Sequence, residues 1–221
     1  MAIEKNNSQF GFTGKTGKLV TRIVNGKRIV SARPGPYKRE SKFVISNNNK
    51  FRYLVKLAKC ITSIPVLKAI WKKYSNGASI GYRSIISENM DLATYVGLTE
   101  SNIIIPSSEY KIINDISIDD NSANISFNLT QNFISTVLEN KLNIILIFAR
   151  LNEKGEMACM ADQYLLIPEK DIEVSLVKFA LGVEVPNFIN DYNDVIVFGT
   201  VTWNLNNTFE LCWSSTFAKK I

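Results

Sequence analysis

The sequence contains few of the side chains that most often carry out catalysis. It has no histidine, so the commonest general base and the commonest zinc ligand are both missing. Its three cysteines, Cys60, Cys159 and Cys212, are widely spaced, which fits neither a disulfide framework nor a zinc cluster and indicates a reducing, intracellular setting. Cys60 lies within a predicted helix, where a small core residue is a simpler interpretation than a nucleophile. We therefore expect no metal and no cofactor.

Carboxylate side chains offer a second route to catalysis. Three pairs are close in sequence, and each pair falls in a predicted turn, where acidic residues are usually solvated. A carboxylate hydrolase would need the two groups to face each other across a cleft. We therefore predict that the protein is not an enzyme, with a hydrolase as the least favoured alternative. The three pairs are Asp119 with Asp120, Glu153 with Glu156, and Asp191 with Asp194.

The tripeptide Gly14-Lys15-Thr16 resembles the end of a P-loop, the G-x-x-x-x-G-K-[ST] segment that binds nucleotide phosphates. That pattern requires its first glycine at position 9, which is Gln9. It also requires a strand before the loop, whereas the predicted strands follow it. The segment therefore does not indicate an NTPase. We expect its glycines to let the backbone pass close to another surface, with Lys15 and Lys18 reaching outward.

The distribution of charge favours an anionic partner. Residues 1–83 contain eighteen Lys and Arg against Glu4 and Glu40, whereas residues 84–221 contain eight Lys and Arg against eighteen Asp and Glu. Repulsion among so many like charges opposes a compact fold, so we expect phosphate groups, an anionic surface or the acidic half of a neighbouring copy to compensate them. The candidate residues for binding a partner or nucleic acid are Lys15, Lys18, Arg22, Lys27, Arg28, Arg33, Lys38 and Arg39.

A β-hairpin is expected to present several of these cations. Two β-rich segments, Leu19–Val24 and Lys27–Ala32, flank Asn25-Gly26, the dipeptide that best tolerates a type I′ turn. An isolated two-stranded ribbon is marginal in water, so we expect the hairpin to lie against another surface. The expected pairs are Val24 with Lys27, Ile23 with Arg28, Arg22 with Ile29, Thr21 with Val30, and Leu19 with Ala32.

The segments on either side of the hairpin are expected to be irregular. Residues 1–12 are polar and contain glycine, which is typical of a mobile lead-in. Residues 33–43 contain two prolines and a glycine, which disfavour a helix and favour an extended arm. This arm is either a device that reaches a partner or an ordinary linker.

Helical periodicity begins at Asn47, and the asparagines at 47–49 offer an N-terminal cap. A second helix is expected to start at Pro65, and a third to span residues 80–93. Trp71 and Tyr74 stand among lysines, where aromatic side chains can stack on bases. At helical spacing we interpret them instead as packing residues.

From residue 103 the pattern is that of strands, rich in β-branched and aromatic residues. It predicts an antiparallel, immunoglobulin-like β-sandwich, although the Cys…Trp…Cys spacing of antibody domains is absent. Residues 131–140 and 171–180 fit short helices or strands equally well, and the sequence leaves open whether the helices pack on the sandwich. The expected strands are residues 103–106, 110–118, 123–129, 143–151, 157–167, 195–205 and 208–217.

The predicted fold is thus α+β and mainly β, in three parts. Residues 1–46 form a basic β-hairpin and an extended arm. Residues 47–98 form two or three short helices. Residues 99–221 form the antiparallel, immunoglobulin-like β-sandwich.

Several short segments together carry a resemblance to a known family. They are residues 14–20 (GKTGKLV), residues 28–34 (RIVSARP), a basic helical pair, residues 104–108 (IIPSS) and residues 144–148 (IILIF). The chain resembles an uncharacterised bacterial family, a domain of unknown function, whose members begin with a G-K-x-G-x-x-V segment and an R-x-x-P strand and end in a β-sandwich-like half. It has Ile29-Val30 where that family often has an aromatic-valine pair. Because no activity is established for the family, the resemblance implies an organisation and no chemistry.

The function that the sequence favours is that of a non-enzymatic structural or assembly protein, such as a component of a phage-type particle or another multi-subunit assembly. The basic hairpin and arm would dock onto neighbouring subunits, in a homo- or hetero-oligomer, or onto nucleic acid. The alternative is a soluble nucleic-acid-binding protein that uses the basic β-ribbon. No transmembrane helix or signal peptide is predicted, so we expect no membrane partner and a location in the cytoplasm or within an assembled particle.

Overall fold

The computed structural model of the protein divides the chain into two compact units, residues 1–44 and residues 45–221. We describe each unit by itself. The described residues are 3–4, 12–16, 19–24, 27–32, 41–75, 81–119, 122–137, 139, 141–151, 155–168, 176–182, 184–190, 195–206 and 208–221.

The first unit is a four-stranded antiparallel sheet, in the order β1-β2-β3-β4. The predicted hairpin register is confirmed for every pair, from Leu19 opposite Ala32 to Val24 opposite Lys27. The dipeptide Asn25-Gly26 itself lies outside the described residues. The four strands are β1 (Ile3–Glu4), β2 (Phe12–Thr16), β3 (Leu19–Val24) and β4 (Lys27–Ala32).

The sequence prediction missed the first two strands of this sheet. Residues 1–12 were expected to be a lead-in, but β1 and the first residue of β2 fall within them. Gly14, Lys15 and Thr16 pair with β3 instead of forming a phosphate-binding loop. A glycine inside a strand weakens the β signal, while the flanking phenylalanine and threonines are good strand formers. The strand that pairs with the hairpin is therefore β2, which is formed by the residues just before it.

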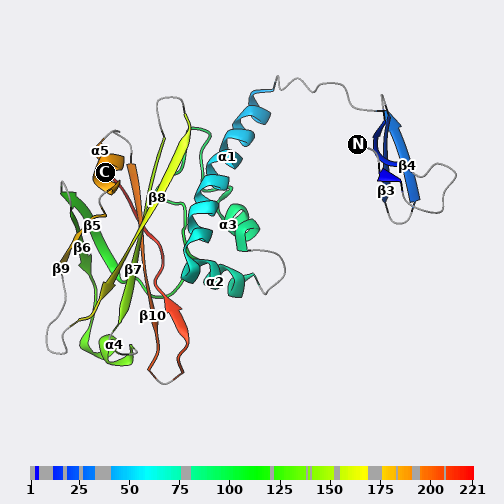
Figure 1. The fold of residues 1–221 in the computed structure, drawn as a ribbon. Coiled ribbons are helices and arrows are strands. Elements are labelled where there is room, and N and C mark those ends of the chain that lie inside the picture. The colour runs from blue at the N-terminus through cyan, green and yellow to red at the C-terminus, as the bar shows by residue number, and fades with distance from the viewer. Residues whose placement is uncertain are drawn as a thin grey trace. The chain divides into compact units, whose positions relative to one another are not determined.

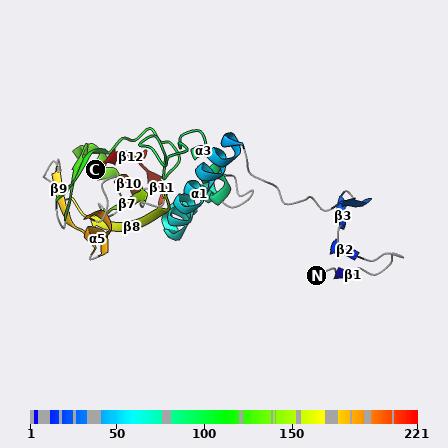
Figure 2. The ribbon, with the colours of Figure 1, turned by 90° about the horizontal axis from the view of Figure 1, so that it is seen from above.

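The second unit is built in three layers (Figures 1 and 2). Helices α1, α2 and α3 lie on one side of a central five-stranded antiparallel sheet, in the order β11-β10-β7-β8 with β12 also paired to β10. An outer three-stranded antiparallel sheet, β5-β6-β9, lies on the other side. The structure thus places the helices directly on the β-structure.

The bounds of these elements are as follows. The helices are α1 (Lys42–Ser63), α2 (Pro65–Tyr74), α3 (Gly81–Asn89), and two short ones, α4 (Gln131–Thr136) and α5 (Glu184–Asn190). The central strands are β7 (Leu142–Leu151), β8 (Met157–Leu166), β10 (Val195–Asn204), β11 (Leu211–Trp213) and β12 (Phe217–Lys220). The outer strands are β5 (Ile113–Asp119), β6 (Ser122–Phe127) and β9 (Leu176–Ala180).

The central sheet is buried on both faces. Alternate residues of a strand point to opposite faces, and in β7 the side chains of Ile144 and Leu146 enter a core shared with the outer sheet. Those of Ile145 and Ile147 enter a second core shared with the helices. We call these the sheet-side core and the helix-side core. Strands that are apolar along most of their length are more usual in parallel sheets, which are covered on both faces. Here an antiparallel sheet contains such a strand because the helices cover its second face.

The two sheets approach each other closely at Gly199 in β10. A Cβ atom at this position would lie 2.7 Å from Cδ1 of Ile116 and 3.0 Å from Cδ1 of Ile113 in β5. A side chain here would force those isoleucines to move. The glycine therefore lets β5 pack directly over the centre of β10.

Helix α1 begins five residues earlier than the sequence indicates, at Lys42 instead of Asn47. The extended arm was predicted to include Lys42 and Phe43, which are helical; residues 33–40 lie outside the described residues. Asparagine is favoured at a cap but costs only a fraction of a kcal/mol inside a helix. The three asparagines are therefore accommodated within α1. The predicted start of α2 at Pro65 is confirmed.

Residues 103–106 were predicted to form a strand but form an irregular segment bound to the helices. The indole Nε1 of Trp71 donates a 2.9 Å hydrogen bond to the carbonyl of Ile104. The side chain of Asn89 accepts a hydrogen bond from the amide of Ile103 and donates one to its carbonyl. A short run of apolar residues is compatible with a strand and with other kinds of buried segment, so its sequence alone does not distinguish them. Trp71 is fully buried, which confirms its interpretation as a packing residue.

The remaining β prediction is partly confirmed. The expected strand at 208–217 is two strands, β11 and β12, because residues 214–216 interrupt it. The undecided segments contain helix α4 and strand β9. The chain is α+β and mainly β, with antiparallel sheets, whereas the immunoglobulin-like arrangement stays a prediction. Within the described residues, every helix is too short or too polar to cross a membrane.

Replacing either Ile144 or Ile145 by alanine should lower the free energy of unfolding by roughly 2–5 kcal/mol. Both side chains are fully buried, one in each core. Denaturant titration followed by circular dichroism measures the change. Asn143→Ala, at an exposed position of the same strand, is the control and should change stability by less than about 0.5 kcal/mol. A large cost at only one of the two isoleucines would contradict the three-layer arrangement.

Candidate functional site

The structure describes only part of the predicted set of binding residues. Arg22 in β3 and Lys27 in β4 are described with their side chains, and both are exposed. Lys15 lies in β2 and Arg28 in β4, where only their backbone positions are described. The structure thus brings four of the predicted residues into one sheet. The other four, Lys18, Arg33, Lys38 and Arg39, lie outside the described residues.

One face of the first unit's sheet carries exposed apolar side chains. The register places Leu19, Ile23 and Val30 on the same face, because Thr21 pairs with Val30 and residues alternate along each strand. These three side chains are 50%, 49% and 54% exposed. None of them belongs to either hydrophobic core. We call this surface the apolar sheet face.

The opposite face of the same sheet mixes cations with an apolar side chain. Arg22 lies directly opposite Ile29, and Lys27 is two residues before Ile29 on the same strand. Arg22, Lys27 and Ile29 are all exposed. This face can therefore offer positive charge beside apolar contact area.

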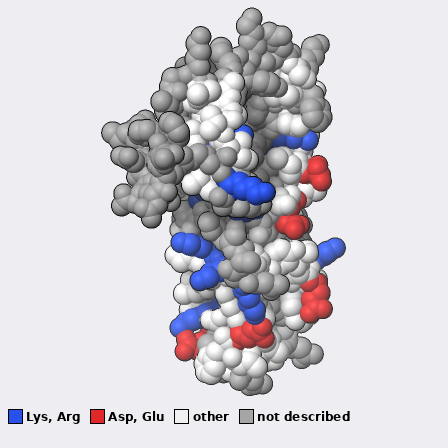
Figure 3. All heavy atoms as spheres, turned by 90° about the vertical axis from the view of Figure 1, so that its right-hand side faces the viewer, with Lys and Arg blue, Asp and Glu red and all other residues white. Residues whose placement is uncertain are grey.

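A larger group of cations lies on the helical layer of the second unit. Residues 45–98 contain eight Lys and Arg against only Glu88 and Asp91. Figure 3 views the molecule from this side and shows several Lys and Arg side chains on the surface, with Asp and Glu along its right edge and beside Lys or Arg in its lower part. Seven of the eight are exposed and Lys50 is half-buried. This basic helical face consists of Lys50, Arg52, Lys56, Lys59, Lys68, Lys72, Lys73 and Arg83.

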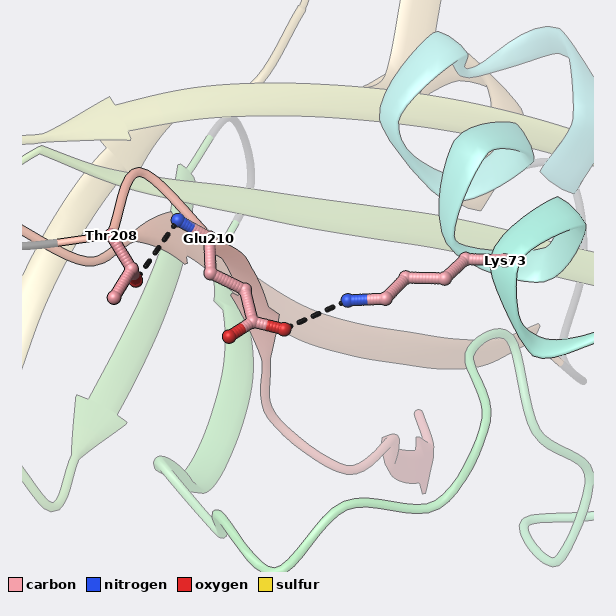
Figure 4. A network of polar contacts seen from close by, with 3 residues as sticks. All are labelled: Lys73, Thr208 and Glu210. Carbon is pink, nitrogen blue, oxygen red and sulfur yellow. Dashed lines mark hydrogen bonds and ion pairs between the residues drawn. The ribbon is translucent and has the colours of Figure 1, made fainter.

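Lys73 is the member of this face that forms an ion pair with a described carboxylate. Its Nζ lies 2.9 Å from Oε1 of Glu210, and the amide of Glu210 donates a hydrogen bond to the hydroxyl of Thr208 (Figure 4). The hydrogen bond and the charge of Glu210 raise the pKa of Lys73, and Lys73 in turn lowers the pKa of Glu210. The contact joins α2 to the segment before β11. The other seven cations form no ion pair with a carboxylate in the part of the chain that the structure describes.

Of the groups considered for catalysis, the cysteines are described, whereas each carboxylate pair has at least one member outside the described residues. Burial raises the pKa of Cys60 to about 11 and also raises that of Cys159, so both thiols are protonated at neutral pH. Asp119 accepts a hydrogen bond from the side chain of Asn124, and Asp120, Glu153, Asp191 and Asp194 lie outside the described residues. A search of the described part of the chain finds no cluster of three or more potential metal ligands.

The cations of the basic helical face were included in the charge count made from the sequence, but they were not predicted to form a site. The available signal was their helical spacing. In α1, Leu54, Leu57 and Ile61 are buried, whereas Lys56 and Lys59 fall between them and are exposed. A helical wheel would therefore have separated the cations from the core positions.

Searches against models of protein families and against curated proteins found no match to this chain. The resemblance to an uncharacterised bacterial family therefore stays a prediction.

Replacing Lys73 by methionine should raise the pKa of Glu210 toward its ordinary value, because the hydrogen bond and opposite charge that lower it are lost. A lowered carboxyl pKa stabilises the fold at pH values above the pKa in the unfolded chain, and this contribution disappears as the pH falls through the folded pKa. Carboxyl-carbon NMR titration of Glu210 measures the shift. Lys72→Met, at the exposed neighbouring position, should leave the pKa of Glu210 unchanged. An identical titration curve in the Lys73 variant would rule out the pair in solution.

Proposed function

We propose that the protein is a non-enzymatic assembly protein whose N-terminal sheet docks onto a neighbouring copy of the chain. The apolar sheet face is the observation that carries this proposal. Leu19, Ile23 and Val30 are about half exposed in the first unit taken by itself, although β-branched and aliphatic side chains on one face of a small sheet normally pack on something. Covering them would contribute roughly 1 kcal/mol for each side chain.

The distribution of charge supports a second copy as the partner. Residues 1–44 contain ten Lys and Arg against Glu4 and Glu40, whereas residues 99–221 contain eight Lys and Arg against sixteen Asp and Glu. The basic unit of one copy is therefore complementary to the acidic β layers of the next. Such a contact is heterologous, since it joins two different surfaces, and it can be repeated to build rings or longer assemblies.

Strand β4 offers a further way to hold such a contact. It lies at the edge of its sheet, paired on one side with β3. The free side of an edge strand can accept a strand from a neighbouring molecule. A phage-type particle is one multi-subunit assembly that would use a protein of this kind, and this part of the proposal rests on analogy of architecture alone.

Serine replacements at Leu19, Ile23 and Val30 together should convert an oligomer into a monomer, because they remove the apolar part of the proposed contact. Size-exclusion chromatography with light scattering, at about 100 µM protein and at low and high salt, measures the mass. Because the proposed contact also joins the basic unit to the acidic β layers of the next copy, high salt should weaken the oligomer without dissociating it fully. Circular dichroism checks that the variant remains folded.

Serine at Ile45, Tyr95 and Val96 provides the matched control. These residues are 44%, 65% and 61% exposed but lie in α1 and in the segment after α3, outside the β layers that would receive the sheet, so their replacement should leave the oligomer intact. A wild-type protein that remains monomeric at this concentration would overturn the proposal. Equal loss of mass in the two variants would do so as well.

Nucleic-acid binding is the second candidate, and the basic helical face favours it. Seven cations on one layer, without a described carboxylate partner, can neutralise several phosphates. Each phosphate contact adds about 0.9 to the slope of log affinity against log salt for duplex DNA. The predicted route through the β-ribbon stays a prediction, because half of the eight predicted cations lie outside the described residues.

The double variant Lys59→Gln/Lys72→Gln should reduce that slope by about 2 for duplex DNA. Fluorescence anisotropy with labelled duplex and single-stranded DNA at several salt concentrations measures it. Lys111→Gln/Lys178→Gln removes two exposed lysines from the β layers and should leave the slope unchanged. An affinity that does not depend on salt would exclude this second candidate.

A further inference from the structure

A half-open cavity of about 510 Å³ lies between helix α1 and the beginning of strand β8. Its size is within the range of small-molecule sites. Both walls belong to the second unit, and the apolar sheet face contributes to neither. The α1 wall consists of Phe51, Arg52, Tyr53, Val55 and Lys56, and the β8 wall of residues 155–158.

The inner part of this cavity is apolar. Met157 is buried, and Val55 and Ala158 are half-buried. Phe51 is 48% exposed, so a large aromatic surface borders the opening. An aliphatic or aromatic body that entered the cavity would be removed from water together with these side chains. The cavity therefore favours an apolar ligand body over a polar one.

Two cationic side chains belong to the α1 wall of the cavity. Arg52 and Lys56 are four residues apart, so they project from the same side of the helix one turn from each other. Both are exposed, and neither forms a hydrogen bond or ion pair with another described residue. Glu156 on the opposite wall is exposed and has an interaction of its own. The two cations thus outnumber the one carboxylate that lines the cavity.

We infer that this cavity binds an amphipathic anion, a molecule with an apolar body and a single carboxylate or phosphate head group. The apolar body would lie against Val55 and Met157. The head group would remain at the opening and accept charge-assisted hydrogen bonds from Arg52 and Lys56. This binding activity is independent of the proposed assembly function.

Isothermal titration calorimetry of the full chain with decanoate, decyl phosphate and 1-decanol tests the inference, with each probe kept below its micelle concentration. Decanoate or decyl phosphate should bind at one site and about tenfold more tightly than 1-decanol, because the alcohol has the same body without the charge. The first two probes distinguish a carboxylate from a phosphate head group. Added salt should weaken the binding of the anions and leave that of the alcohol unchanged.

The double variant Arg52→Gln/Lys56→Gln should weaken binding of the preferred anion about tenfold and leave 1-decanol unaffected. Lys68→Gln/Lys72→Gln is the matched control, since it removes two exposed cations at the same helical spacing from α2, outside the cavity. All four positions are exposed, so the fold should persist, and thermal denaturation checks this. Equal affinity for decanoate, decyl phosphate and 1-decanol, the absence of saturable binding, or an equal effect of the two double variants would overturn the inference.

Discussion

Both faces of strand β7 are buried, and each face therefore requires a layer of structure packed against it. Its odd-numbered isoleucines require a layer on one side and its even-numbered apolar residues a layer on the other. The first requirement is met by α1 to α3 and the second by β5, β6 and β9. The helices are therefore part of the same folded unit as the sheets, and the cavity beside α1 exists because a helix packs against the beginning of β8.

Local signals in the sequence were sufficient where one short interaction decides the structure. The Asn25-Gly26 dipeptide set the complete register of β3 and β4, and Pro65 marked the start of α2. Prediction failed where tertiary contacts decide. Residues 103–106 have the composition of a strand, but their backbone groups are bound by Trp71 and Asn89, which are distant in sequence. The start of α1 was misplaced because asparagine, although favoured at a cap, is also tolerated inside a helix.

The candidate surfaces likewise combine features that the sequence predicts with features that depend on tertiary contacts. Charge could be counted in the sequence, so an excess of cations before residue 84 was evident. Their helical spacing separates them from Leu54, Leu57 and Ile61, but the packing of these apolar residues against the central sheet, which leaves the cations on an outer layer, was not encoded in any local pattern. The exposure of Leu19, Ile23 and Val30 could not be predicted either, because the same residues would be buried in a sheet covered by a second layer. The cavity beside α1 joins residues 51–56 to residues 155–158, a long-range contact that no local pattern encodes.

The order of the layers along the chain has a consequence for biosynthesis. Helices α1 and α2 leave the ribosome before any strand of the central sheet, since β7 begins only at Leu142 and β10 at Val195. Until those strands emerge, Leu57, Ile61 and Trp71 have no sheet to cover them. During much of translation, the nascent chain therefore exposes an apolar stripe that can associate with other apolar surfaces. A chain that ended before β7 would therefore leave these side chains without a covering sheet and prone to aggregate.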